Sequence, residues 1–314
     1  METLINSYVA AFAGLMLLSY CADTLVGSSI VMAQRFKLSK VFIGSAIIGF
    51  GSSLPEVMST TTASLGDHSD LAISTVVGSN IANIGIPLAL CLLISKNWPD
   101  MRKHKLELAF MGIAYVIFVV SAYFGLISQL QGALMAGLLI VLLLISLKVN
   151  KEDEATIELE VDEDKAEQSN LFELFLGIIV GLVGLAIGAD LLINGATAIA
   201  QDLGVSDKVI GLTLVALGTS LPEAAASISA AKKGESGLVL GNIVGSNMFN
   251  ILAALGIAAA FKPLVINDFA LDSLFLVLMA LLLVPFFFRK NGNNKVYGIA
   301  LLVAYASYIY FVAL

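Results

Sequence analysis

Long runs of apolar residues, separated by short polar connections, make up most of this chain. A helix needs about 20 apolar residues to cross a bilayer core of about 30 Å. The pattern therefore predicts ten transmembrane helices, several of them longer than required, which allows tilt or a break within the span. We expect these helices near residues 4–31, 41–65, 71–95, 106–125, 128–148, 171–200, 207–231, 237–261, 269–288 and 296–313.

The composition indicates an all-α membrane protein whose surroundings are the lipid bilayer. Hydrophobic residues make up 58% of the 314 residues, charged residues make up 13%, and the mean hydropathy is +0.93. A soluble domain is about half apolar and about a quarter charged. The sequence has no basic stretch interleaved with aromatic residues, so nucleic acid is not an expected partner.

The positions of lysine and arginine predict the orientation of the helices. Fifteen of the 17 basic residues lie in connections that follow odd-numbered helices, and only Lys208 and Lys262 lie on the opposite side. Short cytoplasmic connections carry an excess of basic residues. We therefore expect a protein of the plasma (inner) membrane with both termini outside and the segment 149–170 in the cytoplasm.

This segment, 149–170, carries the whole net charge of −7. Nine acidic residues lie between Glu152 and Glu167, and only Lys151 and Lys165 accompany them. The segment lacks the glycine and the ordered ligand spacing of an EF-hand loop. We interpret it as a solvated linker, as for most charge runs, rather than as a Ca²⁺ sensor.

The sequence matches itself at a spacing of 167 residues. GSSLPE at 51–56 aligns with GTSLPE at 218–223, VGSN at 77–80 aligns with VGSN at 244–247, and the register holds without a gap for about 60 residues. Each repeat would contribute five helices, and because five is odd the second repeat must enter the membrane from the opposite side. The predicted units are residues 1–148 for the first repeat, 149–170 for the linker and 171–314 for the inverted second repeat.

Two carboxylates, Glu56 and Glu223, are predicted at about the middle of the second and seventh helices. Placing an aspartate at the centre of a membrane helix costs about 2.5–3.5 kcal/mol, and glutamate presents the same problem. No basic residue lies in the predicted membrane core to pair with them, so we expect them to bind a cation. Hydroxyl groups lie about one turn earlier on the same helix faces, from Ser52, Ser53, Thr219 and Ser220.

Backbone carbonyls offer further oxygen atoms beside these carboxylates. Pro55 and Pro222 have no backbone N–H, so we expect carbonyl groups one turn earlier, near Gly49 and Ala216, to be free to bind an ion. Irregular backbone at this depth is tolerated only where it is buried in protein or lines a cavity. Both prolines therefore point to an ion site rather than to a lipid-facing break.

The third and eighth helices offer hydroxyl and amide groups. Ser79 with Asn83, and Ser246 with Asn250, are i, i+4 pairs, so each pair places a hydroxyl and a side-chain carbonyl on one helix face. Such groups can also serve only as hydrogen bonds between helices. Paired residues with that structural role could also recur in a repeat, but we favour a role in binding an ion.

These groups are all hard oxygen donors. Ca²⁺ takes 6–8 such oxygens at about 2.3–2.6 Å, and the same donors suit Na⁺. Two carboxylates neutralise one Ca²⁺, whereas three Na⁺ would leave one net positive charge. A site that holds either load but not both predicts an antiporter. Asp23 and Asp190 lie on the first helix of each repeat, and we interpret them as structural or gating residues rather than as ligands.

The two hexads, each followed by a GSN element, resemble the α-repeats of the sodium/calcium exchanger family, in its prokaryotic type, within the cation/Ca²⁺ exchanger superfamily. The resemblance implies a 5+5 inverted-repeat fold with helices 2, 3, 7 and 8 as the ion-binding core. It also implies that the first helices of the two repeats slide against this core, which fits Asp23 and Asp190 as gating residues. By similarity the ligands would be Glu56, Glu223, Ser52, Ser53, Thr219, Ser220, Ser79, Ser246 and the carbonyls of Gly49 and Ala216, with Asn83 and Asn250 nearby.

Two positions depart from the pattern of the family. Ser52 stands where threonine is commoner, which removes a methyl group but no ligand. Asn250 stands where several relatives carry aspartate, and in one branch that aspartate accompanies K⁺ co-transport. Asn250 therefore favours K⁺-independent exchange. We expect a monomeric transporter rather than an enzyme, with no cofactor and with Ca²⁺ and Na⁺ as the transported ions.

Three other functions compete with Na⁺/Ca²⁺ exchange. A Ca²⁺/H⁺ or other cation/H⁺ exchanger could use the two carboxylates to carry protons, although the additional hydroxyl and carbonyl ligands have little use in that scheme. A channel is less consistent with two inverted repeats, which indicate alternating access. A membrane-embedded protease is disfavoured because the sequence has neither an HExxH helix nor a GxGD-type aspartate pair.

Overall fold

The computed structural model of this protein describes residues 2–95, 98, 104–152, 170–205, 218–267, 269–288 and 294–313. The first half contains α1 (Glu2–Arg35), α2 (Lys40–Ile43), η1 (Gly44–Gly49), α3 (Phe50–Ser52), α4 (Leu54–Leu65), α5 (Ser69–Asn83), η2 (Ile84–Leu88), α6 (Ala89–Ile94), α7 (Lys105–Phe124), β1 (Leu126–Ile127) and α8 (Gln129–Glu152). The second half contains α10 (Leu171–Asp202), α13 (Leu221–Lys232), α14 (Ser236–Phe249), η6 (Asn250–Leu255), α15 (Gly256–Phe261), β2 (Leu264–Val265), α16 (Ala270–Phe288) and α17 (Asn294–Ala313). The segments η1, η2 and η6 are π-helical.

Helical segments lie at all ten predicted spans within the described residues. Seven helices in that part of the chain are long and apolar enough to cross a membrane, and the pair 40–52 and 54–65 forms an eighth span bent by 44°. The apolar helix at 270–285 is shorter, and the seventh span is described only from Gly218 onward. Most of the acidic linker, residues 153–169, lies outside the described residues. The prediction of an all-helical membrane fold is confirmed.

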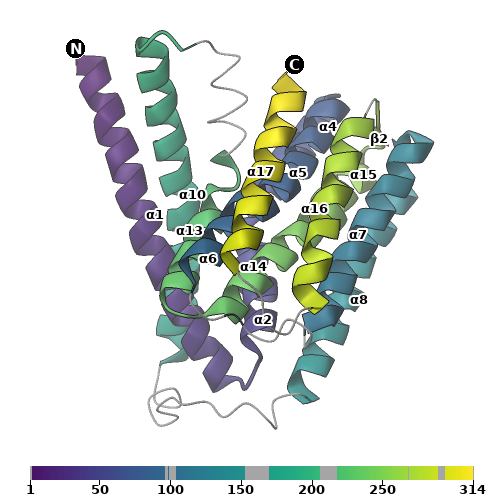
Figure 1. Cartoon of the computed structure of the whole chain (residues 1–314), viewed down its shortest axis with the longest axis horizontal. Coiled ribbons are helices and arrows are strands. Elements are labelled where there is room, and N and C mark those ends of the chain that lie inside the picture. The colour runs from purple at the N-terminus through teal and green to yellow at the C-terminus, as the bar shows by residue number, and fades with distance from the viewer. Residues whose placement is uncertain are drawn as a thin grey trace.

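The first helices of the two repeats, α1 and α10, pack against each other in opposite directions (Figure 1). A Cβ atom added to Gly14 would lie 2.5 Å from the backbone nitrogen of Leu192, and one added to Gly181 would lie 2.7 Å from the Cβ of Leu25. Contacts that advance along one helix while they retreat along the other require an antiparallel pair. Equivalent helices of the two halves therefore run in opposite senses, which is the inverted repeat expected from the sequence.

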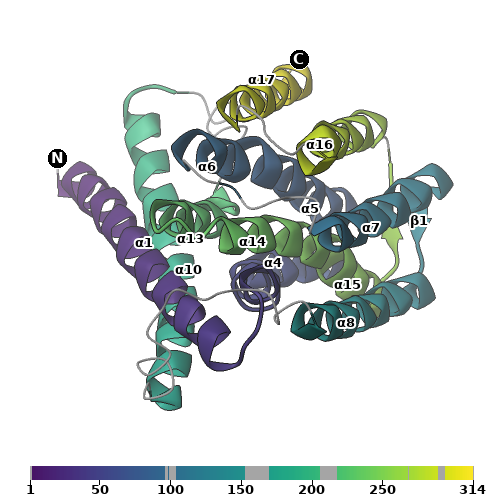
Figure 2. The ribbon, with the colours of Figure 1, turned by 60° about the horizontal axis from the view of Figure 1, so that its bottom comes forward.

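A second close contact, between η1 and α14, forms the centre of the bundle. A Cβ atom added to Gly49 would lie 2.9 Å from the backbone nitrogen of Ser246, and one added to Gly245 would lie 2.5 Å from the Cα of Ser45. Small residues allow membrane helices to approach at backbone distance. Figure 2 shows α14 at the centre, with α5 and α4 beside it and with α1 and α10 at one edge.

A two-stranded contact at one end of the bundle was not predicted. β1 and β2 pair antiparallel, with Leu126 opposite Val265 and Ile127 opposite Leu264. Two residues per strand are too few for the alternating pattern that identifies a strand in a sequence. This small ladder joins the α7–α8 connection of the first repeat to the α15–α16 connection of the second.

Candidate cation-binding site

The two mid-membrane carboxylates lie in the first turns of α4 and α13, directly after breaks in the helices. Glu56 and Glu223 are completely buried, and the hydroxyl of Ser53, three residues before Glu56, donates a hydrogen bond to Glu223. Within the described residues, both carboxylate oxygens of Glu56 and Oε2 of Glu223 have no hydrogen-bond partner. Buried carboxylate oxygens without partners carry a large desolvation cost, so they are suited to a positively charged ligand.

Predicted hydroxyl groups of one repeat contact predicted groups of the other repeat. The Oγ of Ser53 donates a hydrogen bond of 3.1 Å to Oε1 of Glu223. The hydroxyl oxygens of Ser79 and Thr219 are 3.0 Å apart, which joins α5 to the residues before α13. The structure therefore brings the predicted hydroxyls of the two repeats into one cluster, although they are far apart in sequence.

The carbonyl of Gly49 is buried in this cluster but is not free, which differs from the expectation drawn from Pro55. It accepts a hydrogen bond of 3.2 Å from the backbone N–H of Ser53, and the hydroxyls of Ser52 and Ser246 lie within 3.4 Å and 3.3 Å of it. The helix breaks at Ser53, so Pro55 lies in the first turn of a new helix, where a missing N–H leaves no carbonyl unpaired. Ala216, the predicted counterpart, lies outside the described residues.

The amides of Asn83 and Asn250 lie where α5 contacts α14 and the start of η6. Asn83 donates a hydrogen bond of 3.1 Å to Oδ1 of Asn247, and Asn250 donates one of 3.1 Å to Oδ1 of Asn80. The side-chain oxygens of Asn83 and Asn250 have no hydrogen-bond partner among the described residues. Asn80 and Asn247 were missing from the predicted site, although each ends a VGSN tetrad and the repetition of that tetrad was a usable signal.

The assembled groups are two carboxylates with neutral hydroxyl and amide oxygens around them. Among the described residues no cluster of three or more His, Cys, Asp or Glu side chains is suited to a metal ion. Ser220, the counterpart of Ser53, is buried and its Oγ has no hydrogen-bond partner there. Such a set can balance two positive charges and supply further neutral oxygens, which matches the needs of Ca²⁺.

The two aspartates of the first helices are both exposed and differ in their contacts. Asp23 on α1 accepts a hydrogen bond from the hydroxyl of Ser229 on α13. The Nζ of Lys233 donates to the backbone oxygen of Asp23 at 2.9 Å and lies 3.6 Å from its carboxylate. Asp190 on α10 is exposed. The repeat places Thr62 and Gly66 where Ser229 and Lys233 would be, so the described residues provide no equivalent lysine for Asp190.

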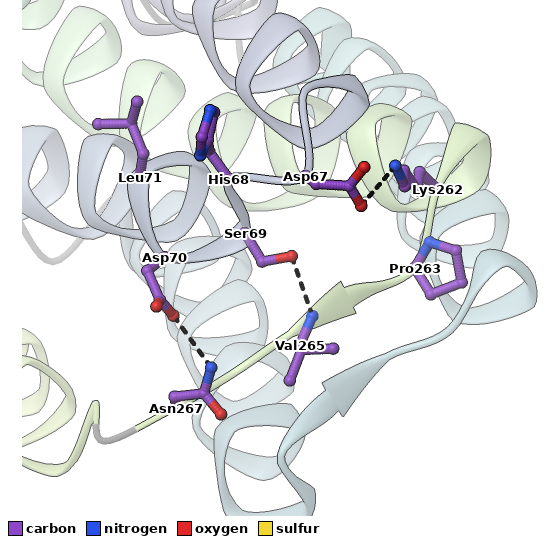
Figure 3. Close-up of a pocket in the computed structure, with 9 residues that line it drawn as sticks. All are labelled: Asp67, His68, Ser69, Asp70, Leu71, Lys262, Pro263, Val265 and Asn267. Atoms are coloured by element: carbon purple, nitrogen blue, oxygen red, sulfur yellow. Dashed lines mark hydrogen bonds and ion pairs between the residues drawn. The ribbon is translucent and has the colours of Figure 1, made fainter.

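A separate pocket of about 580 Å³ lies at the end of the bundle that carries the β1–β2 ladder (Figure 3). Lys262 forms an ion pair of 2.7 Å with Asp67, and Asn267 lies 3.4 Å from Asp70. The Lys262 ammonium lowers the pKa of Asp67 below its usual value. These contacts join the α4–α5 region of the first repeat to the α15–α16 region of the second. The side chains are solvent exposed, so the pocket is distinct from the buried cluster.

This chain is similar to known proteins over nearly its whole length. The family model of the sodium/calcium exchanger protein matches residues 6–148 and 173–314. An uncharacterized membrane protein of Methanocaldococcus jannaschii is 37% identical over 93% of this chain and 93% of its own length. The sodium/calcium exchanger MaX1 of Methanosarcina acetivorans is 27% identical over 96% of this chain and 97% of its own.

A solved structure has the same fold. The sodium-calcium exchanger NCX_Mj, soaked with 10 mM Na⁺ and 10 mM Sr²⁺, superposes with a TM-score of 0.82 at 33% sequence identity. The match covers 97% of this chain and 97% of that chain. The likeness therefore extends over both repeats.

Proposed function

This chain belongs to the sodium/calcium exchanger protein family, and on that premise we propose that it exchanges Na⁺ for Ca²⁺ across the plasma membrane. Membership confirms the predicted family and makes the protein a membrane antiporter that transports cations. The named relatives support Na⁺ and Ca²⁺ as its ions: both MaX1 and NCX_Mj are described as exchangers of sodium and calcium.

The observation that carries this proposal is the pair of buried carboxylates with oxygens that lack partners. Glu56 and Glu223 together balance one Ca²⁺, and neutral oxygens from helices 2, 3, 7 and 8 complete its coordination. The proposed ligands are Glu56, Glu223, Ser52, Ser53, Thr219, Ser220, Ser79, Ser246, Asn83, Asn250 and the carbonyls of Gly49 and Ala216. To bind the ion, the Gly49 carbonyl would give up its hydrogen bonds from the hydroxyls of Ser52 and Ser246. Three Na⁺ on the same groups would leave one net positive charge, so the two loads exclude each other and exchange at 3:1 is electrogenic.

Alternating access rests on movement of the α1–α10 pair against the core. The two helices pack tightly on each other through glycines, so they can move as one unit. Asp23 with Ser229 and Lys233 holds α1 to α13, and this contact must break when the pair moves. Asp190 is the equivalent gating residue for the opposite side, where the chain has no lysine at the corresponding position.

The arrangement in the membrane follows from the charges. The basic residues that follow odd-numbered helices face the cytoplasm, so the linker 149–170 is cytoplasmic and both termini are outside. The start of α1 and the end of α17 lie at the same end of the bundle (Figure 1), which supports an even number of spans. The two repeats at 1–148 and 171–314 enclose one ion site, so the unit of transport is a monomer.

The test is Ca²⁺ uptake into liposomes that contain the purified protein. Vesicles loaded with Na⁺ are diluted into Na⁺-free medium with radioactive Ca²⁺, and a pH gradient without Na⁺ serves as the comparison. Glu223→Gln should abolish uptake. Ser121→Ala should not, because within the described residues the Ser121 hydroxyl bonds only to the carbonyl of Ile117 on its own helix. Uptake that depends on a pH gradient but not on Na⁺ would identify a Ca²⁺/H⁺ exchanger instead.

A further inference from the structure

Four buried asparagines form two equivalent hydrogen bonds where α5 contacts α14 and the start of η6. Asn250 donates to Asn80, and Asn83 donates to Asn247, each over 3.1 Å. Positions 80 and 247, and positions 83 and 250, differ by 167, so the two bonds are the same contact made once in each direction. All four side chains are completely buried. The contact therefore follows the internal symmetry of the protein and links its two repeats.

The orientation of the Asn250 amide is determined by a chain of donors and acceptors. The Nδ2 of Asn80 lies 3.2 Å from the backbone oxygen of Asn247, which can only accept a hydrogen bond. Asn80 must therefore direct its oxygen towards Asn250, and Asn250 must direct its nitrogen back. The remaining atom, Oδ1 of Asn250, is buried and has no hydrogen-bond partner among the described residues.

The equivalent series of hydrogen bonds that orients Asn83 ends on a different acceptor. The Nδ2 of Asn247 lies 3.8 Å from the sulfur of Met111 on α7, a weak acceptor. Asn247 therefore directs its oxygen towards the nitrogen of Asn83, and Oδ1 of Asn83 has no partner within the described residues. Asn83 is thus held by a weaker anchor than Asn250, because a thioether replaces a backbone carbonyl.

The free oxygens lie on the helix faces that carry the site hydroxyls. Asn83 follows Ser79 by four positions, and Asn250 follows Ser246 by four, so each amide shares a face with a hydroxyl of the cluster. Both asparagines also adjoin a change from α-helix to π-helix, since η2 begins at Ile84 and η6 begins at Asn250. Such π-helical segments are frequent at functional sites.

We infer that Asn80 and Asn247 are positioning residues, which turn the amide oxygens of Asn250 and Asn83 towards the transported cation. An amide rotated by half a turn would present its NH₂ group, which repels a cation. The inference rests on the function proposed above, because it requires that a cation enters the cluster. It adds two residues that act on the ion through others and do not touch it.

A double-mutant cycle of Asn80→Ala and Asn250→Ala tests this inference. The readouts are the KM for Ca²⁺ and the maximal rate of Na⁺-driven uptake, with equilibrium binding of radioactive Ca²⁺ in detergent as a second measurement. Asn80→Ala should raise KM by about fivefold to tenfold, as expected for loss of one oriented ligand, and should change the maximal rate by less than about twofold. In the Asn250→Ala background, Asn80→Ala should have almost no further effect.

A matched control removes a buried hydrogen bond that is not part of the cluster. The hydroxyl of Ser64 lies 3.4 Å from the carbonyls of Ala258 and Lys262, so Ser64→Ala loses a contact between helices without touching the asparagines. Its KM should equal that of the parent protein. If Asn80→Ala does not fold, the cycle of Asn247→Ala with Asn83→Ala replaces it.

The outcomes separate this inference from the proposed function. Additive effects of the two substitutions on KM would overturn the inference, because Asn80 would then act independently of Asn250. An unchanged KM in Asn80→Ala would also overturn it. If the parent protein neither binds Ca²⁺ nor takes it up in exchange for Na⁺, the proposed function fails first and the inference fails with it.

Discussion

The Oγ of Ser53 donates a hydrogen bond of 3.1 Å to Oε1 of Glu223, so a hydroxyl of the first repeat binds the carboxylate of the second. The equivalent contact from Ser220 to Glu56 is not made in the described part of the chain, where the Ser220 hydroxyl and both Glu56 oxygens have no partner. The two halves of the candidate site therefore differ in structure although their sequences match. We therefore expect equivalent substitutions in the two repeats to have different effects.

Glu56→Gln and Glu223→Gln should each abolish Ca²⁺ transport. Either substitution leaves one carboxylate for a divalent cation, and loss of one charge from a buried pair costs about 3–5 kcal/mol. That energy corresponds to more than about 100-fold in Ca²⁺ affinity. Equilibrium binding of radioactive Ca²⁺ measures the change, and affinity within about tenfold of the parent protein in either variant would remove that glutamate from the ligand set.

Ser53→Ala and Ser220→Ala should differ in their effect on stability without Ca²⁺ or Na⁺. Ser53→Ala removes the hydrogen bond to Glu223, and bonds to charged groups contribute about 1.5–3 kcal/mol. Ser220→Ala removes a hydroxyl that has no hydrogen-bond partner in the described residues, so its unfolding midpoint should fall less. Thermal unfolding in detergent compares the two, and equal midpoints would show that the two halves are equivalent in solution.

Asp23→Asn and Lys233→Met should weaken the contact between α1 and α13. Both remove the charge pair, so the α1–α10 pair should leave its present position more easily and the site should open more often to the side where Lys233 lies. Asp190→Asn is the matched control, because it changes the equivalent residue without removing a lysine pair. Uptake in vesicles of the two orientations measures the effect, and identical changes in Asp23→Asn and Asp190→Asn would contradict a one-sided contact.

Lys262→Met should alter the pH dependence of stability at low pH without altering transport at pH 7. Lys262 lowers the pKa of Asp67, so the pair stabilises the folded protein above the usual aspartate pKa of about 4. That stabilisation is lost as the pH falls through the lower pKa of the folded state. The effect should be small because Asp67 is exposed. Unfolding midpoints between pH 3 and pH 7 test this, and a loss of Ca²⁺ uptake at pH 7 would contradict a purely structural pair.

The sequence by itself determined the membrane class and the inverted repeat, and it predicted ten spans. Apolar length is decisive in a bilayer, since every backbone polar group must be satisfied within the element. The repetition of the hexads and tetrads likewise predicted Glu56 and Glu223 as candidate ligands, because an intramembrane carboxylate without a basic partner needs a reason to be retained.

Tertiary structure decided which groups meet and which atoms remain free. Helix spacing placed Asn83 and Asn250 on a useful face, but only the packing of α5 against α14 showed that Asn80 and Asn247 hold their amides. The state of the Gly49 carbonyl also depended on packing, because its hydrogen bonds come from the break at Ser53 and from Ser246 on another helix. Contacts between distant segments depend on approach and orientation in space, and a pattern along one chain does not contain them.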